Sequence, residues 1–64
     1  MDIREGAWFR LKSGSIHQVI RLFGGDEPEV MQRYEDGTQD VIPRELFERI
    51  AVCEVFPIWK DVEP

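Results

Sequence analysis

The chain has 64 residues with one cysteine and one histidine, so it is long enough for one small domain but has neither an internal disulfide nor the ligands of a structural zinc site. Its net charge of −5 argues against general nucleic-acid binding, which needs clustered basic residues. No apolar run approaches the ~20 residues of a membrane span, and the first residues lack a signal-peptide pattern. We therefore expect a cytoplasmic protein with no metal, no cofactor and no membrane contact.

The charge is unevenly distributed along the chain. Residues 1–23 carry four basic and two acidic groups, whereas residues 24–64 carry four basic and eleven acidic groups. This asymmetry fits either an acidic face for a basic protein partner or ordinary solubilising charge.

The first third of the chain predicts two strands after a short polar lead-in at residues 1–6. Residues 7–12 alternate with a period of two, which places Ala7, Phe9 and Leu11 on one face of a strand. The cluster Ser13-Gly14-Ser15 predicts a turn. Residues 17–23 are rich in β-branched and aromatic side chains but alternate poorly, which predicts a bent strand that serves two faces.

The middle of the chain predicts a hairpin. After a flexible loop at residues 24–28, a strand at 29–34 places Val30, Gln32 and Tyr34 on one face. Asp36-Gly37 predicts a two-residue turn, because a tight hairpin needs positive φ angles. The returning strand covers residues 38–42, and Pro43, which has no amide proton to donate, ends it.

The last third predicts a single 3₁₀ turn at residues 44–47, a fifth strand at 48–52 and an apolar tail at 53–64. The tail packs either on its own domain or on another chain. Five short strands with one helical turn before the last indicate an all-β fold, a small SH3-like barrel. It forms one domain over residues 1–64, with its core at about 6–52.

The chain lacks the patterns of the common catalytic sites. Gly24-Gly25 precedes two acids and a proline rather than a helix, so it does not form a phosphate-binding loop. Cys53 and His17 have no spacing typical of a nucleophile and its base. We expect Cys53 to be an inert strand residue and His17 to be a rim or partly buried residue. Paired acids lie in turns, where they are solvated. The sequence therefore predicts no enzyme.

Three arginines occupy three successive predicted strands. Because neighbouring strands lie less than about 5 Å apart, Arg10, Arg21 and Arg33 can share one sheet face, with Trp8 or Tyr34 nearby. They then bind either a phosphate or carboxylate ligand, or an acid on the adjacent strand.

The order of Gly6, Arg10 to Gly14, Tyr34, Gly37 and Ile42 to Ile50 resembles the plasmid-borne type II dihydrofolate reductases over residues 6–50. The resemblance implies an SH3-like barrel that assembles into a ring tetramer. That family binds its substrate and cofactor through a Val-Gln-Ile-Tyr run, and the corresponding run in this chain is Gln39 to Ile42. An aspartate would then face a pore for anionic ligands, so the reductase activity is not expected.

The chain is also similar to small bacterial and phage proteins with a Lys-Ser-Gly turn and the hairpin found here at Arg33 to Gly37. This similarity implies an accessory protein of a mobile element. We expect a non-enzymatic module that contacts a protein partner or its own copies through Trp8, Tyr34, Phe56 and Trp59. The alternative is a homo-oligomer with a site for an anionic metabolite or nucleotide at its subunit interface, formed by the three arginines. Nucleic-acid binding is not expected.

Overall fold

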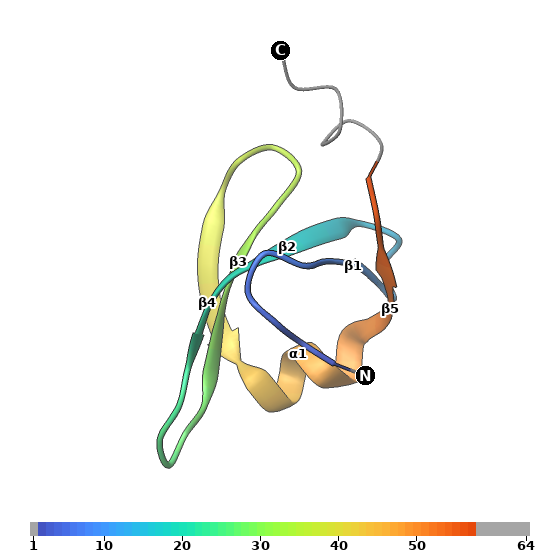
Figure 1. Cartoon of the computed structure of the whole chain (residues 1–64). Helices are drawn as coiled ribbons and strands as arrows, with labels where there is room; N and C mark the ends of the chain where they lie inside the picture. Colours follow the sequence, from blue (N-terminus) through green and yellow to red (C-terminus); the bar gives the residue numbers. More distant parts are fainter. Residues whose placement is uncertain (1, 58–64) are drawn as a thin grey trace.

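The structure is a computed structural model that describes residues 2–57, which form one antiparallel sheet and one short helix (Figure 1). In chain order the elements are β1 (Trp8–Leu11), β2 (Ile16–Phe23), β3 (Glu29–Arg33), β4 (Gln39–Pro43), α1 (Arg44–Ile50) and β5 (Ala51–Val55).

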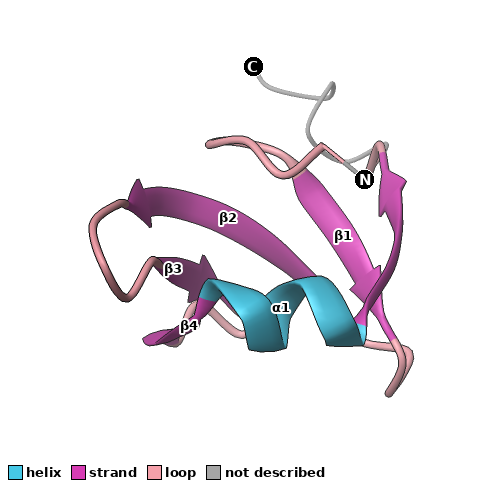
Figure 2. Cartoon of the chain, turned by 90° about the horizontal axis from the view of Figure 1, so that it is seen from below, coloured by secondary structure: helices cyan, strands magenta, loops and turns pink. Residues whose placement is uncertain are grey.

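The strands lie in the order β4-β3-β2-β1-β5, so β4 and β5 are the two edges of the sheet. Figure 2 shows that the sheet curves, with α1 on its open side. Because α1 connects the two edge strands directly, it bridges the gap between them. The all-β class expected from the sequence is thus confirmed as five strands in one sheet, whereas β4 and β5 do not pair and the sheet of the described residues is not closed.

The core lies between the inner face of the curved sheet and α1. Phe9 on β1 and Phe47 on α1 are both fully buried, and their rings meet edge to face with centroids 5.7 Å apart. The predicted inward face of β1 is confirmed, since Ala7, Phe9 and Leu11 are all buried. Ile3 is also buried, so the residues before β1 cover the core rather than forming only a polar lead-in.

The second strand pairs with β1 along one edge and with β3 along the other, and it contains a bulge. Val19 pairs with Gln32 and Arg21 with Met31, so Ile20 is an extra residue in the β2 ladder. A bulge bends a strand and changes which face the following side chains occupy. This irregularity accounts for the poor alternation of residues 17–23.

The predicted hairpin forms between β3 and β4, but its two-residue loop was wrong. The Tyr34 amide donates to the Thr38 carbonyl at 2.8 Å, which leaves Glu35, Asp36 and Gly37 as a three-residue loop. Only Gly37 has a positive φ, of 93°, as in a type I turn closed by a glycine bulge. The Asp36 carboxylate accepts bonds from the Thr38 hydroxyl and amide, which lower the pKa of Asp36.

The predicted 3₁₀ turn and the start of the fifth strand were also wrong. Residues 44–50 form two turns of α-helix, and β5 begins at Ala51 and continues to Val55. The exposed side of the helix carries two ion pairs, Arg44–Glu48 and Glu45–Arg49, and the two residues of each pair are one helical turn apart. Burial of Phe47 on the opposite side favours the helix over a single turn. At seven residues, α1 is too short to cross a membrane, and the described residues contain no longer helix.

Candidate functional site

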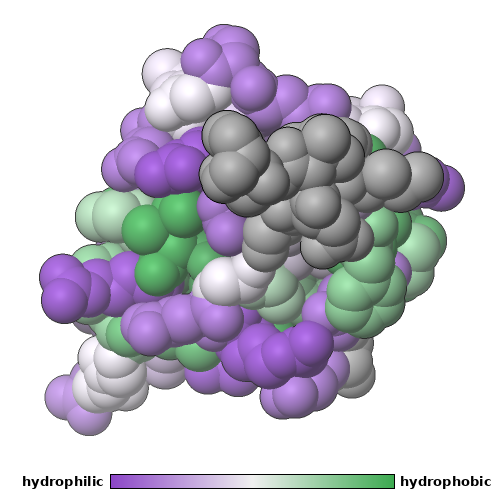
Figure 3. All heavy atoms as spheres, turned by 45° about the horizontal axis from the view of Figure 1, so that its top comes forward, coloured by the Kyte–Doolittle hydropathy of each residue, from purple (hydrophilic) through white to green (hydrophobic). Residues whose placement is uncertain are grey.

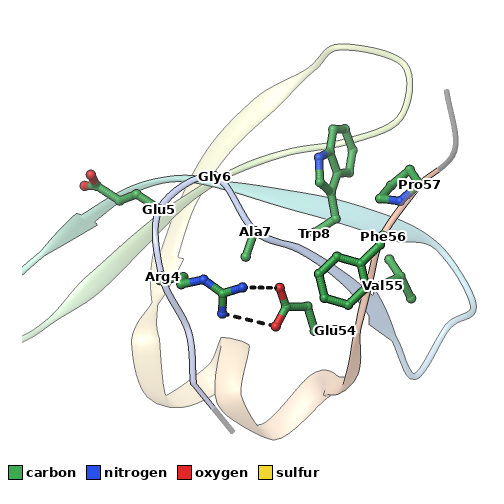
Figure 4. A pocket seen from close by; sticks show the side chains of 9 residues that line it. All are labelled: Arg4, Glu5, Gly6, Ala7, Trp8, Glu54, Val55, Phe56 and Pro57. Carbon is green, nitrogen blue, oxygen red and sulfur yellow. Dashed lines mark hydrogen bonds and ion pairs between the residues drawn. The ribbon is translucent and has the colours of Figure 1, made fainter. Parts of the chain in front are cut away.

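A pocket of about 390 Å³ lies where the segment before β1 meets the end of β5 (Figure 4). The Arg4 guanidinium binds both carboxylate oxygens of Glu54, at 3.1 and 2.6 Å. The hydrogen bond to Glu54 is the main cause that raises the pKa of Arg4. This bidentate pair joins the two segments that form the pocket, although residues 4 and 54 are far apart in the sequence.

The other wall of the pocket is apolar. It is formed by Trp8, Val55, Phe56 and Pro57 (Figure 4). Phe56 is 78% exposed, and Trp8 is only partly buried. On the face shown in Figure 3, exposed apolar atoms of the described residues lie in patches bordered by hydrophilic side chains.

The pocket brings together two of the four aromatic residues that the sequence singled out for partner binding. Trp8 and Phe56 both line it. Tyr34 lies elsewhere, with its ring 4.2 Å from that of His17. Trp59 lies outside the described residues. Both residues line the pocket because Trp8 pairs with Val55, the residue before Phe56, across β1 and β5.

The strand registers place Arg10, Arg21 and Arg33 on the outer face of the sheet, opposite the core. Arg33 pairs with Gln18, and Gln18 pairs with Trp8, so these three side chains share one row across the sheet. Arg10 lies one row to one side of it, and Arg21 one row to the other. The expected neighbour Trp8 is thus on this face, whereas Tyr34 is with His17 on the core side.

None of these three arginines forms an ion pair or hydrogen bond with another described residue. The alternative in which each arginine neutralises an acid on the adjacent strand is therefore not seen in residues 2–57. The three side chains are exposed. Their guanidinium groups are available to an anionic molecule.

A polar network, in which His17 and Gln32 are buried and Asp40 is exposed, lies on the inner face of β2, β3 and β4, and it was not predicted from the sequence. The His17 ring lies 2.8 Å from the Gln32 carbonyl oxygen, and the Gln32 amide donates to Asp40 at 2.9 Å. The Tyr34 hydroxyl donates to the second Asp40 oxygen at 2.7 Å. At the other end, Ser15 lies 3.2 Å from His17 Nε2. His17 and Gln32 are 5% and 2% exposed, so His17 is more buried than the rim or partly buried position expected.

The network fixes the hydrogen-bonding roles of its members. Because Asp40 accepts from the Gln32 amide nitrogen, the Gln32 oxygen faces His17 and requires a proton on Nδ1. In the neutral ring, Nε2 then accepts from Ser15. The signal that predicts such a network is the alternation of β3, which puts Gln32 on the same face as Val30.

The network borders a shallow hollow of about 590 Å³, whose apolar side is formed by Leu11, Ile42, Leu46 and Ile50. Because each buried polar side chain of the network already has a partner, it stabilises the sheet rather than awaiting a ligand. Within residues 2–57, no three carboxylate, histidine or cysteine side chains gather as metal ligands would. Cys53 is a free and exposed thiol on β5.

Comparisons with protein families, with curated proteins and with solved structures found no significant match to this chain.

Proposed function

We propose that the chain is a non-enzymatic binding module that holds an extended segment of a protein partner against the end of β5. The contact surface consists of Trp8, Phe56 and the free edge of β5, and we call it the Phe56 surface. The observation that carries the proposal is the 78% exposure of Phe56 beside a pocket.

An exposed phenylalanine in this position is a source of binding free energy. Fully burying a large apolar side chain contributes about 1.5 to 3 kcal/mol. Aromatic residues seated in pockets carry much of the energy of protein interfaces. Phe56 is the most exposed large hydrophobic side chain of the described residues, and the pocket beside it gives a partner side chain a place to insert.

The edge of β5 explains why the partner segment is extended. Within the described residues β5 pairs only with β1, so its other edge lacks a neighbouring strand. Such an edge accepts a strand from another chain through main-chain hydrogen bonds. Val52, which is 52% exposed on β5, adds apolar surface along this edge. A partner strand thus gains main-chain bonds from β5 and a side-chain contact from Phe56.

Site-specific photocrosslinking in the native host cell tests this proposal. A photoreactive phenylalanine analogue at position 56 is expected to capture one defined protein. The same analogue at position 46 is the matched control, because Leu46 is also exposed, at 39%, but lies on α1 and does not line the pocket beside Phe56. The captured protein is then purified, and Phe56→Ala is expected to weaken its binding about tenfold or more.

Equal capture from both positions would show that the contact is not specific to the Phe56 surface. Unchanged binding of the purified partner by Phe56→Ala would also reject the proposal. Capture of a second copy of this chain would assign the surface to self-association, which sedimentation of the wild type and of Phe56→Ala distinguishes from binding to another protein.

The strand order and the helix between β4 and β5 support assignment of the fold to the SH3-like barrels, with β5 beside β1. The resemblance of the hairpin and of the Lys-Ser-Gly turn to phage and plasmid proteins supports a cytoplasmic role as an accessory protein of a mobile element. Both assignments belong to the proposal.

A further inference from the structure

The outer face of the sheet separates positive from negative charge. Its registers place three arginines there but only one acid, Glu29, which lies at the far end beside Phe23 and Pro43. The chain as a whole has thirteen acids and a net charge of −5. Glu5 and Glu35 border this face, where their carboxylates accept bonds from the amides of Leu22 and Ile16. Among the side chains that the strand pairing places on the face itself, arginines outnumber acids three to one.

The arginines of the described residues fall into two sets. Arg4, Arg44 and Arg49 each form an ion pair with a glutamate. Arg10, Arg21 and Arg33 form none, and all three lie on the outer face. Each described arginine outside this face thus forms an ion pair with an acid, whereas none of the arginines on it does. This holds although acids outnumber basic residues in the chain.

The bulge in β2 creates this arrangement. Val19 faces the core, so strict alternation would place Ile20 on the outer face and Arg21 on the core face. The extra residue at Ile20 shifts the alternation by one, and Arg21 pairs with Met31 on the outer face. Without the bulge, this face would carry two arginines.

The spacing of the three arginines favours a polymer over a small anion. Neighbouring strands lie about 4.8 Å apart and alternate residues about 6.7 Å apart, so the three Cα positions are roughly 8 to 14 Å from one another. The three guanidiniums reach a single phosphate or carboxylate only if all three long side chains bend toward the same point. A chain with one phosphate per nucleotide can meet all three in turn.

We propose that this face binds single-stranded nucleic acid through its phosphates. Guanidinium groups bind phosphate oxygens in a bidentate manner. Met31 and Val41 share the row of Arg21, and Val41 is 43% exposed. They provide apolar surface between the phosphate contacts, on which unstacked bases can lie. The contacts are with the backbone, so binding is independent of sequence.

Fluorescence anisotropy of the full-length chain with a labelled oligothymidylate of about 15 nucleotides tests the proposal. Three phosphate contacts predict that log K falls with log salt concentration with a slope of about −2. Arg21→Ala with Arg33→Ala is expected to weaken binding about tenfold at low salt and to reduce the slope to about −0.7.

The matched control is Arg44→Ala with Arg49→Ala, which removes the same charge from the ion-paired arginines of α1. It is expected to change the affinity by less than about twofold. Phe56→Ala is expected to keep nucleic-acid binding, which separates this proposal from that for the Phe56 surface.

Absence of binding by the wild type at low salt would overturn the proposal, and so would an equal loss in both double variants. Competition by polyglutamate as effective as that by unlabelled oligothymidylate would assign the face to an acidic protein instead. Competition by a mononucleotide or inorganic phosphate at the same concentration of charge would indicate a small-anion site.

Discussion

The Nδ1 atom of His17 lies 2.8 Å from the Oε1 atom of Gln32, and both side chains are almost completely buried. The pair joins β2 to β3 through side chains, and Asp40 extends the connection to β4. A network whose polar groups are all hydrogen-bonded stabilises a fold, whereas loss of one member leaves a polar atom of each neighbour without its partner.

Gln32→Ala is expected to lower the free energy of unfolding by about 2 to 3 kcal/mol, because His17 loses a buried hydrogen-bond partner. Urea denaturation measures the effect. Gln39→Ala, at an exposed position on β4, is the control and is expected to change the free energy by about 0.5 kcal/mol or less. Similar values for the two variants would show that the network contributes little to stability.

Tyr34 is expected to ionise at a higher pH in the folded chain than in the unfolded chain. Its hydrogen bond to Asp40 favours the protonated phenol and raises the pKa of Tyr34 above its ordinary value of 10.0. The stability that this bond contributes is therefore fully present below the unfolded pKa and is lost as the pH rises through the folded pKa.

Absorbance of tyrosinate measures this pKa directly, because Tyr34 is the only tyrosine. Asp40→Asn is expected to move the pKa of Tyr34 back toward the ordinary value. Titration of Tyr34 at the same pH in native buffer and in urea would contradict the prediction.

Gly37→Ala is expected to destabilise the chain by about 1 to 2 kcal/mol, because Gly37 has a φ of 93° that alanine adopts only with strain. Nothing lies close enough to clash with the added methyl group, so the backbone conformation alone is tested. Gly24→Ala is the control, since Gly24 has no positive φ and equal space. It is expected to be neutral or to stabilise by up to about 1 kcal/mol. Thermal unfolding measures the stability of both variants. An equal loss of stability in the two would show that the positive φ of Gly37 is not the cause.

Phe47→Ala is expected to lower the free energy of unfolding by about 3 to 5 kcal/mol, because it leaves a cavity and removes the ring contact with Phe9. Phe47→Leu retains most of the volume and is expected to cost about 1 to 1.5 kcal/mol. The adjacent Leu46 is 39% exposed, and Leu46→Ala is expected to cost about 1 kcal/mol or less. Equal losses at positions 46 and 47 in urea denaturation would contradict the observed orientation of α1.

The strands were predictable from the sequence because alternation and turn residues act locally. The inward face of β1 and the position of the hairpin at Asp36-Gly37 are examples. The length of that hairpin loop was not predictable, because it depends on the pairing of Tyr34 with Thr38. The helix was missed because seven residues have little helical stability alone, and burial of Phe47 in the core favours α1.

The candidate surfaces were less predictable than the strands. The aromatic character of Trp8 and Phe56 was visible in the sequence, but their place at one pocket depends on the register between β1 and β5. The orientation of Arg21 depends on the bulge at Ile20, and the poor alternation of residues 17–23 indicated an irregular strand without locating the extra residue. Sequence patterns identify candidate residues, whereas register and bulges decide which of them share a face.

The direct connection from Pro43 through α1 to Ala51 has a consequence for how this chain can change in length. No loop separates the helix from either strand, so the number of helical residues sets where β5 starts on β1. One inserted residue would rotate the end of α1 by about 100° and displace β5 from its present register. The loop between β2 and β3 has no such constraint at residues 24–27, because all four residues are exposed, whereas the Pro28 carbonyl accepts a bond from the Arg44 amide. Insertions in homologous chains should therefore accumulate between β2 and β3, whereas the length of the helix should stay constant.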